Sequence, residues 1–289
     1  MSIQLGLTQL KRTIMRYPPP SFEQICGIAR KAIDIFRSHG LECCLVGGVG
    51  CHLFGTSRDP TSGCSYQSTQ QEELKRYLVQ ADSDFYLISA RDPRATYKVL
   101  WYRISSTYYE RRCKVDILIP GILNIPDVPY AHVKVISRLP VMPLIPLLLL
   151  KLQAWADHGN ATRFDLRMKQ DVDIRDINEL LEIALRRRER VSDVVNWLPK
   201  EFLDAARIRI RAYTTVPIIR LFLGRALDSQ HDRAHFSIDV YQTENEVLAS
   251  GHPVVRSYVL VQFSRLDPEL YCVKLRTYDL FMKYKCCVQ

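Results

Sequence analysis

The chain has 289 residues, of which 47% are hydrophobic and 25% are charged, and its formal net charge is +9 at pH 7. This composition is ordinary for a soluble globular protein, excludes low-complexity classes, and suffices for one large or two modest domains. The apolar run at 139–152 contains three prolines and is too short to cross a bilayer, so we predict no membrane partner.

The number and spacing of the cysteines indicate the cellular compartment in which we expect the protein. Nine cysteines occur at irregular spacing and without a Cys-x-x-Cys pair, which favours neither a zinc site nor a disulfide framework. We therefore expect reduced thiols in an intracellular, most simply cytoplasmic, protein.

The first predicted elements are a helix, a strand and a second helix. Ser21 and Gln24 form a capping-box pattern, and apolar residues then recur at helical spacing as far as Gly40. The apolar residues 43–46 predict a buried strand, followed by a glycine pair and then by a short helix at 49–54.

That glycine pair, Gly47 and Gly48, permits a tight turn between strand and helix, and Gly55 suits a left-handed helix stop. Free N–H groups and the helix dipole would make such a turn an anion cradle, although a glycine pair after a strand is more often only a turn.

The middle of the chain alternates strands and one helix. We predict a polar strand at 65–69, a helix at 70–80, and strands at 85–90, 97–104 and 114–119. In the strand at 97–104, period two places Tyr97, Val99, Trp101 and Arg103 on one face.

The strand at 114–119 carries an acid, Asp116, between Val115 and Ile117. A carboxylate in an apolar strand is costly to bury unless it is paired or held for chemistry. Two explanations remain open, a catalytic carboxylate or one satisfied by an Arg or Lys partner.

The second half is mainly helical after a proline-rich connector. We predict one strand at 133–139, helices at 147–155 and 169–184, and two short helices in 191–222. The segment 257–263 also has strand character, but the sequence does not identify its partner.

Lys169, Asp173 and Asp176 fall on one stripe of the helix at 169–184. The stripe indicates either a charged face beside a cleft or an exposed ion pair of the common i,i+4 kind. Residues 186–225 hold ten Lys or Arg against four acids, which suits either a polyanion such as RNA or a solvated basic face.

Several of these segments together resemble the nucleotidyltransferase fold in its fungal and bacterial form. The resemblance rests on the glycine pair, the short helix and Arg58-Asp59-Pro60, and extends to 97–102, 114–120 and 147–155. It implies an α/β (α+β) fold with a mixed sheet flanked by helices and followed by a helical region.

The resemblance also implies metal-dependent transfer of a nucleotide from a nucleoside triphosphate to an acceptor, such as RNA or a protein. Gly47, Gly48 and Arg58 would then bind phosphate, and Asp116 would be the third catalytic acid and a Mg²⁺ ligand. The Lys169, Asp173 and Asp176 stripe would border the nucleotide.

The sequence departs from that family at the metal clamp. Where the family places Asp-x-Asp after Arg-x-Pro, this chain has Ser62 and Cys64, which cannot replace carboxylates at a magnesium site. We predict an enzyme whose Mg²⁺ binding and activity are impaired or lost. Two alternatives remain, a non-catalytic nucleotide-, RNA- or protein-binding module and a misjoined coding boundary at 61–68.

The predicted organisation has four parts. They are an N-terminal extension (1–20), an α/β core (21–140), a helical region packed on the core (141–225), and a C-terminal extension without a recognisable motif (226–289).

Overall fold

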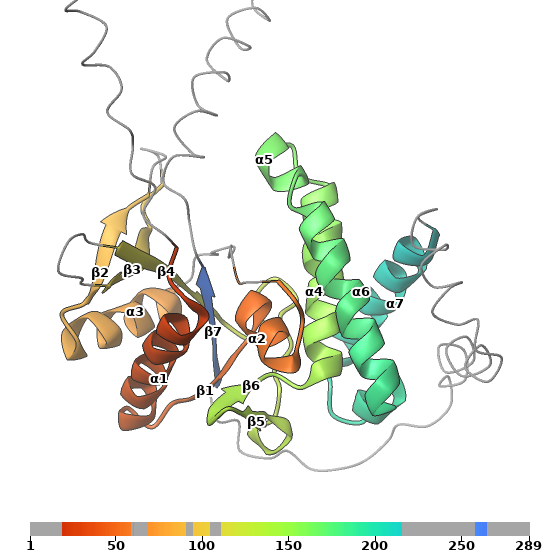
Figure 1. Cartoon of the computed structure of the whole chain (residues 1–289), viewed down its shortest axis with the longest axis horizontal. Helices are drawn as coiled ribbons and strands as arrows, with labels where there is room; N and C mark the ends of the chain where they lie inside the picture. The colour runs from red at the N-terminus through yellow and green to blue at the C-terminus, as the bar shows by residue number, and fades with distance from the viewer. Residues whose placement is uncertain are drawn as a thin grey trace, which may run out of the picture.

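The computed structural model of the chain describes residues 19–58, 60, 69–90, 95–104, 111–215 and 258–264. A single seven-stranded mixed sheet, in the order β2-β3-β4-β7-β1-β6-β5, is combined with helices (Figure 1). The predicted class, a mixed sheet with flanking helices, is thereby confirmed.

The strands are β1 (Glu42–Leu45), β2 (Phe85–Ser89), β3 (Lys98–Ile104), β4 (Arg111–Leu118), β5 (Lys134–Ile136), β6 (Leu139–Val141) and β7 (Tyr258–Ser264). The α-helices are α1 (Phe22–Ser38), α2 (Gly47–Phe54), α3 (Thr69–Ala81), α4 (Leu144–Gly159), α5 (Phe164–Arg167), α6 (Gln170–Arg187) and α7 (Lys200–Thr215). Two 3₁₀ turns, η1 (Tyr130–His132) and η2 (Val191–Val194), complete the set of described elements.

The first helices begin and end where the sequence signals predict. Ser21 caps α1, and both hydrogen bonds of its capping box with Gln24 are present. Helix α2 starts two residues earlier than predicted, because the glycine pair forms its first turn. It ends at Gly55, which adopts the left-handed conformation with φ +109°.

The predicted strand at 133–139 is wrong in outline. These residues form the antiparallel hairpin of β5 and β6, whose turn residues Ser137 and Arg138 both have positive φ, +51° and +62°. Pro140 pairs with Val135 inside that hairpin. A proline and a two-residue turn without glycine or asparagine conceal the hairpin from sequence rules.

The position of β7 in the sheet is the least local feature of the fold. It lies between β4 and β1, antiparallel to the first and parallel to the second, with Ile117 and Leu45 on either side of Val261. The strand character of 257–263 is therefore confirmed, and its partners are β4 and β1. Of the polar strand predicted at 65–69, only Thr69 lies in the described part of the chain, where it begins α3.

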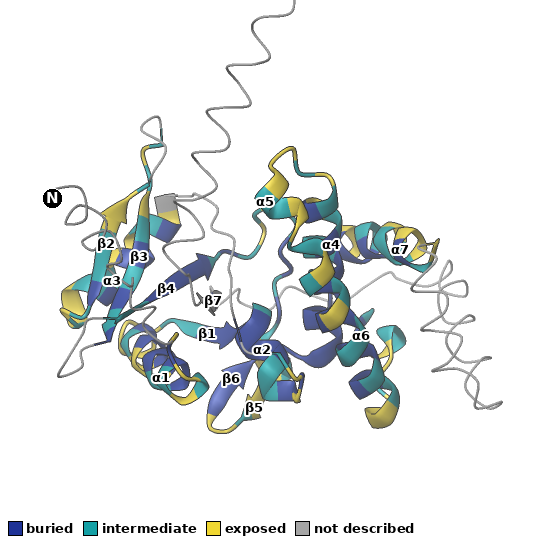
Figure 2. Cartoon of the chain, turned by 45° about the horizontal axis from the view of Figure 1, so that its top comes forward, coloured by how far each residue is buried: buried dark blue, intermediate teal, exposed yellow. Residues whose placement is uncertain are grey.

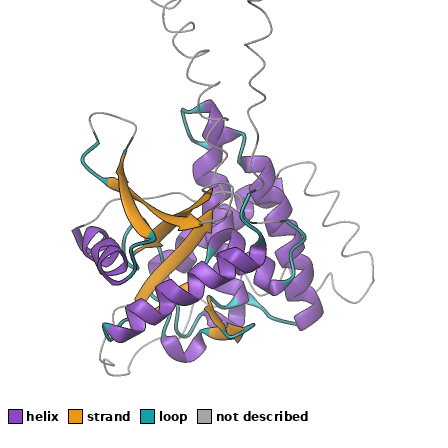
Figure 3. Ribbon diagram, turned by 60° about the vertical axis from the view of Figure 1, so that its left-hand side comes forward, coloured by secondary structure: helices purple, strands orange, loops and turns teal. Residues whose placement is uncertain are grey.

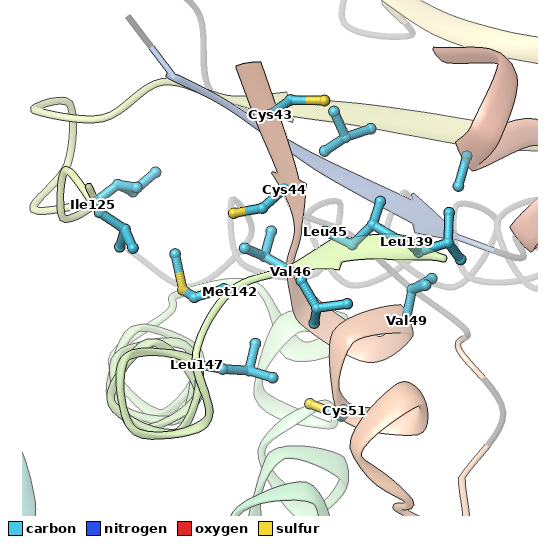
Figure 4. Close-up of a cluster of buried hydrophobic side chains, with 14 of the residues drawn as sticks. Cys43, Cys44, Leu45, Val46, Val49, Cys51, Ile125, Leu139, Met142 and Leu147 are labelled. Carbon is cyan, nitrogen blue, oxygen red and sulfur yellow. The ribbon is translucent and has the colours of Figure 1, made fainter. Parts of the chain in front are cut away.

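Helices α1 and α3 lie side by side against one face of the sheet (Figure 3). Strand β3 buries alternate residues, Leu100, Tyr102 and Ile104, whereas β4 is buried over consecutive residues and is mainly dark blue in Figure 2. A second part of the core forms where β1, β6, α2 and α4 meet, and Figure 4 shows its side chains around Val46, Met142 and Leu147.

Helices α4, α6 and α7 pack on one another, and α2 contacts both α4 and α6. In the described part of the chain, no helix combines the length and apolar character that a membrane crossing requires.

Candidate functional site

The turn between β1 and α2 brings three segments close together. Gly47 has φ +63°, a backbone conformation that residues other than glycine rarely adopt. A Cβ atom on Gly48 would lie 3.2 Å from Cα of Pro60 and 3.4 Å from the Arg58 side chain. The glycine pair is therefore needed both for the turn and for the close approach of the segment that follows α2.

Arg58 makes a two-point ion pair with Asp176 of α6. Its Nε lies 2.8 Å from Oδ1 and its Nη2 lies 2.6 Å from Oδ2. The segment is held there by Ser57, whose Oγ donates to Glu179 at 2.6 Å, and by His52, whose Nδ1 lies 3.1 Å from the Arg58 carbonyl. The predicted phosphate ligand Arg58 is thus engaged with a buried carboxylate, only 1% of whose side chain is exposed.

This ion pair continues into a buried chain of charges between α4 and α6. Lys151 Nζ lies 2.6 Å from Asp176 and 3.5 Å from Asp173. Asp173 in turn lies 2.5 Å from His158 Nδ1. We call the five residues Arg58, Lys151, His158, Asp173 and Asp176 the charge network.

The charge network shifts the pKa values of Asp176 and Lys151 in the direction that favours their charged forms. Burial alone raises the pKa of Asp176, but the hydrogen bond from Arg58 and the charge of Lys151 outweigh it and hold that pKa below its usual value. Burial likewise lowers the pKa of Lys151, but the charges around it, including Asp176 and Asp173, raise it above the ordinary lysine value. Burial raises the pKa of the neighbouring Cys51 thiol to about 12, which excludes a reactive thiolate there.

The predicted stripe on α6 is only partly brought together. Asp173 and Asp176 meet in the charge network, but Lys169 lies at the N-cap of α6 and contributes its carbonyl to the first turn. The buried ammonium comes instead from Lys151 of α4.

Sequence reasoning missed Lys151 and His158. The detectable signal was a lysine within the leucine-rich run of α4, with a histidine seven residues later on the same helix face. A charge in an otherwise apolar helix indicates a buried partner on another element.

Asp116 lies on β4 and is buried, with 2% of its surface exposed. Its Oδ1 is 2.7 Å from Lys114 Nζ, whereas Oδ2 has no hydrogen-bond partner among the described residues. The register places Asp116 level with Val46, two strands away across β7. Two strand spacings correspond to about 10 Å between the backbones of β4 and β1 at this level.

The residues around Asp116 do not fit a magnesium ion. At this position one carboxylate oxygen, Asp116 Oδ2, has no hydrogen-bond partner among the described residues, and the ammonium of Lys114 already balances the charge. Among the described residues, no group of three or more His, Cys, Asp or Glu side chains could hold a metal. Ser62 and Cys64, the positions of the expected clamp, lie outside the described residues.

Comparison of the chain with protein-family models, with curated proteins and with solved structures finds no match. Its function is therefore inferred from the geometry of the site.

Proposed function

We propose that this protein is a nucleotidyltransferase-like nucleotide-binding protein that does not carry out magnesium-dependent transfer. The proposal takes the fold to be a variant of that family, with a glycine turn between β1 and α2 and an acid on a strand level with it. The ligand would be a nucleoside triphosphate, bound at the N-terminus of α2.

The observation that carries the proposal is the ion pair of Lys114 with Asp116. The two residues lie two positions apart on β4, so their side chains share one face. At 2.7 Å, the Lys114 ammonium neutralises the carboxylate that would otherwise favour a divalent cation. A lysine can attract phosphate directly, without metal, as a point charge.

The second observation is the glycine turn between β1 and α2, which leads into the N-terminus of α2. The first N–H groups of α2 have no partner within the helix, and the dipole of the helix favours an anion there. Gly48 leaves the backbone without a side chain at this end, facing Pro60 and Arg58. Arg58 would act as a positioning residue, because its side chain is held by Asp176.

The test is calorimetric titration of the full chain with ATP and GTP, with and without Mg²⁺. We expect weak binding whose Kd changes little when Mg²⁺ is removed. Gly48→Ala should weaken binding, whereas the matched control Gly27→Ala on α1, where an added Cβ meets nothing within 4 Å, should not.

Two results would contradict the proposal. One is binding that requires Mg²⁺, which would mean that acids elsewhere complete a metal site. The other is transfer of label from a radiolabelled nucleotide to RNA or protein, which would make the chain a working transferase.

A further inference from the structure

The face of β2 and β3 that points away from α1 and α3 is only partly covered, whereas on β4 the same face holds the buried residues Lys114 and Asp116. Along β3, Leu100, Tyr102 and Ile104 are buried, whereas the residues between them are half-exposed. In Figure 2, β2 is largely coloured as exposed or intermediate, unlike the buried strand β6. Strands β2 and β3 therefore have one core face and one partly accessible face.

The accessible face carries aromatic rings and guanidinium groups that lie close together. The register aligns Tyr86 of β2 with Trp101 of β3 and Lys114 of β4, and it aligns Arg103 with Arg112 in the next row. Arg112 Cζ lies 4.7 Å from the centre of the Trp101 ring, and Arg103 Cζ lies 5.3 Å from that of Tyr86. We call Tyr86, Trp101, Arg103 and Arg112 the aromatic–arginine face.

We propose that the aromatic–arginine face binds single-stranded nucleic acid. Unpaired bases stack on aromatic rings and on guanidinium planes, and cationic side chains pair with the phosphates between them. Two rings and two guanidinium groups on one sheet surface provide both kinds of interaction. A duplex would present only phosphates to such a surface, because its bases are already stacked.

Charge and position support this occupant. The aromatic–arginine face contributes two positive charges and no negative charge, and the whole chain carries a net +9. Lys114, next along the sheet from Trp101, connects this face to Asp116, two residues further along β4. A bound strand would thus run toward the candidate nucleotide site, although its binding requires neither the glycine turn nor Asp116.

The competing explanation is that the two arginines only shield the rings from water. Substitutions would then change stability and leave nucleic-acid binding untouched. A second competitor is the basic run at the end of α6, where Arg186 is well exposed and weakly paired with Glu182 at 3.7 Å.

The experiment measures fluorescence anisotropy of short labelled oligouridine and oligothymidine with the full chain. Trp101→Leu, which keeps an apolar side chain, should weaken binding about ten-fold because the base loses its stacking surface. Arg112→Glu should weaken it similarly and reduce the slope of log affinity against log salt by about 0.7 for each phosphate that is no longer neutralised. The matched control Arg186→Glu makes the same charge change elsewhere and should leave affinity within about two-fold.

A rescue variant and a cross-linking map complete the test. Arg112→Lys should bind more tightly than Arg112→Glu, because lysine still pairs with phosphate. It should bind less tightly than the unmodified chain, because lysine has no guanidinium plane on which a base can stack. With the unmodified chain, photocross-linking to 5-iodouracil oligonucleotides should label Tyr86 or Trp101, whatever the folding of the variants. Cross-links confined to 186–211, equal losses with Arg186→Glu, or a preference for duplex would overturn the proposal. Unchanged ATP titration in Trp101→Leu would separate this face from the nucleotide site.

Discussion

Arg58 and Asp176 are 118 residues apart in the sequence, yet their side chains meet in a two-point ion pair of 2.8 and 2.6 Å. The pair joins the segment after α2 to α6. It therefore fixes the glycine turn against the helical region, and the same carboxylate also receives Lys151.

Loss of that pair should destabilise the protein. Arg58→Ala leaves a buried carboxylate with Lys151 as its remaining partner, and we expect a loss of about 3 kcal/mol in the free energy of unfolding. Arg58→Lys should recover only part, because a lysine cannot make both bonds in one plane. Urea denaturation measures the free energy of unfolding of both variants. The exposed pair of Arg37 with Asp34 is the control, and Arg37→Ala should change stability by less than about 1 kcal/mol.

The charge network should make stability depend on pH at the acid end. The pKa of Asp176 is lower in the folded protein than in the unfolded chain. Its contribution is therefore complete above the unfolded pKa of about 3.9 and is lost as pH falls through the folded value. Asp176→Asn should flatten the fall in urea midpoint below about pH 4. An identical acid profile for the variant would contradict this assignment.

Lys151 should act at the opposite end of the pH range. Because its pKa is raised in the folded protein, its contribution is complete below the unfolded pKa of about 10.4 and is lost as pH rises through the folded value. Lys151→Met should abolish that alkaline loss, measured by the same denaturation as the pH is raised above about 10.4, where the unfolded chain begins to lose the lysine proton.

Two glycine-to-alanine changes should have opposite signs. In Gly48→Ala the new Cβ lies 3.2 Å from Pro60 Cα, so we expect destabilisation of about 1–3 kcal/mol. In Gly27→Ala an added Cβ meets no atom within 4 Å inside α1, so we expect stabilisation of about 0.5–1 kcal/mol. Thermal denaturation measures the stability of the two variants. Stabilisation by Gly48→Ala as well as by Gly27→Ala would show that the turn does not need glycine at position 48.

An acid introduced on β7 opposite Asp116 should create a metal site, whereas acids introduced at positions 62 and 64 should not. Gln262 is the register partner of Asp116, and opposite residues have Cβ atoms about 5 Å apart, close enough for two carboxylates to share one cation. Lys114→Met with Gln262→Asp should therefore bind Mn²⁺ detectably by electron paramagnetic resonance.

The comparison variant combines Ser62→Asp with Cys64→Asp. It should bind no more Mn²⁺ than the unmodified chain, because the ammonium of Lys114 still neutralises Asp116, the acid that would complete the site. Metal-dependent nucleotide transfer by this variant would instead mean that only the clamp had been lost.

The sequence predicted the local elements well, because their signals are local. The capping box of α1 and the left-handed stop at Gly55 each depend on a few neighbouring residues. Alternation along β3 correctly separated the two faces of that strand.

The remaining features depend on residues distant in the chain. Period two says which residues share a face, but not which strand lies beside it, so the place of β7 was hidden. Spacing on α6 grouped Asp173 with Asp176, but it pointed to Lys169 rather than to Lys151 on another helix.

The place of β7 has a consequence for synthesis of the protein. Val261, which pairs with Leu45, is made 216 residues later, or about 10–40 s at usual translation rates. Until then the growing chain has β1 and β4 without the strand that separates them, and unpaired strand edges are templates for aggregation. The central sheet therefore closes only after β7 has left the ribosome.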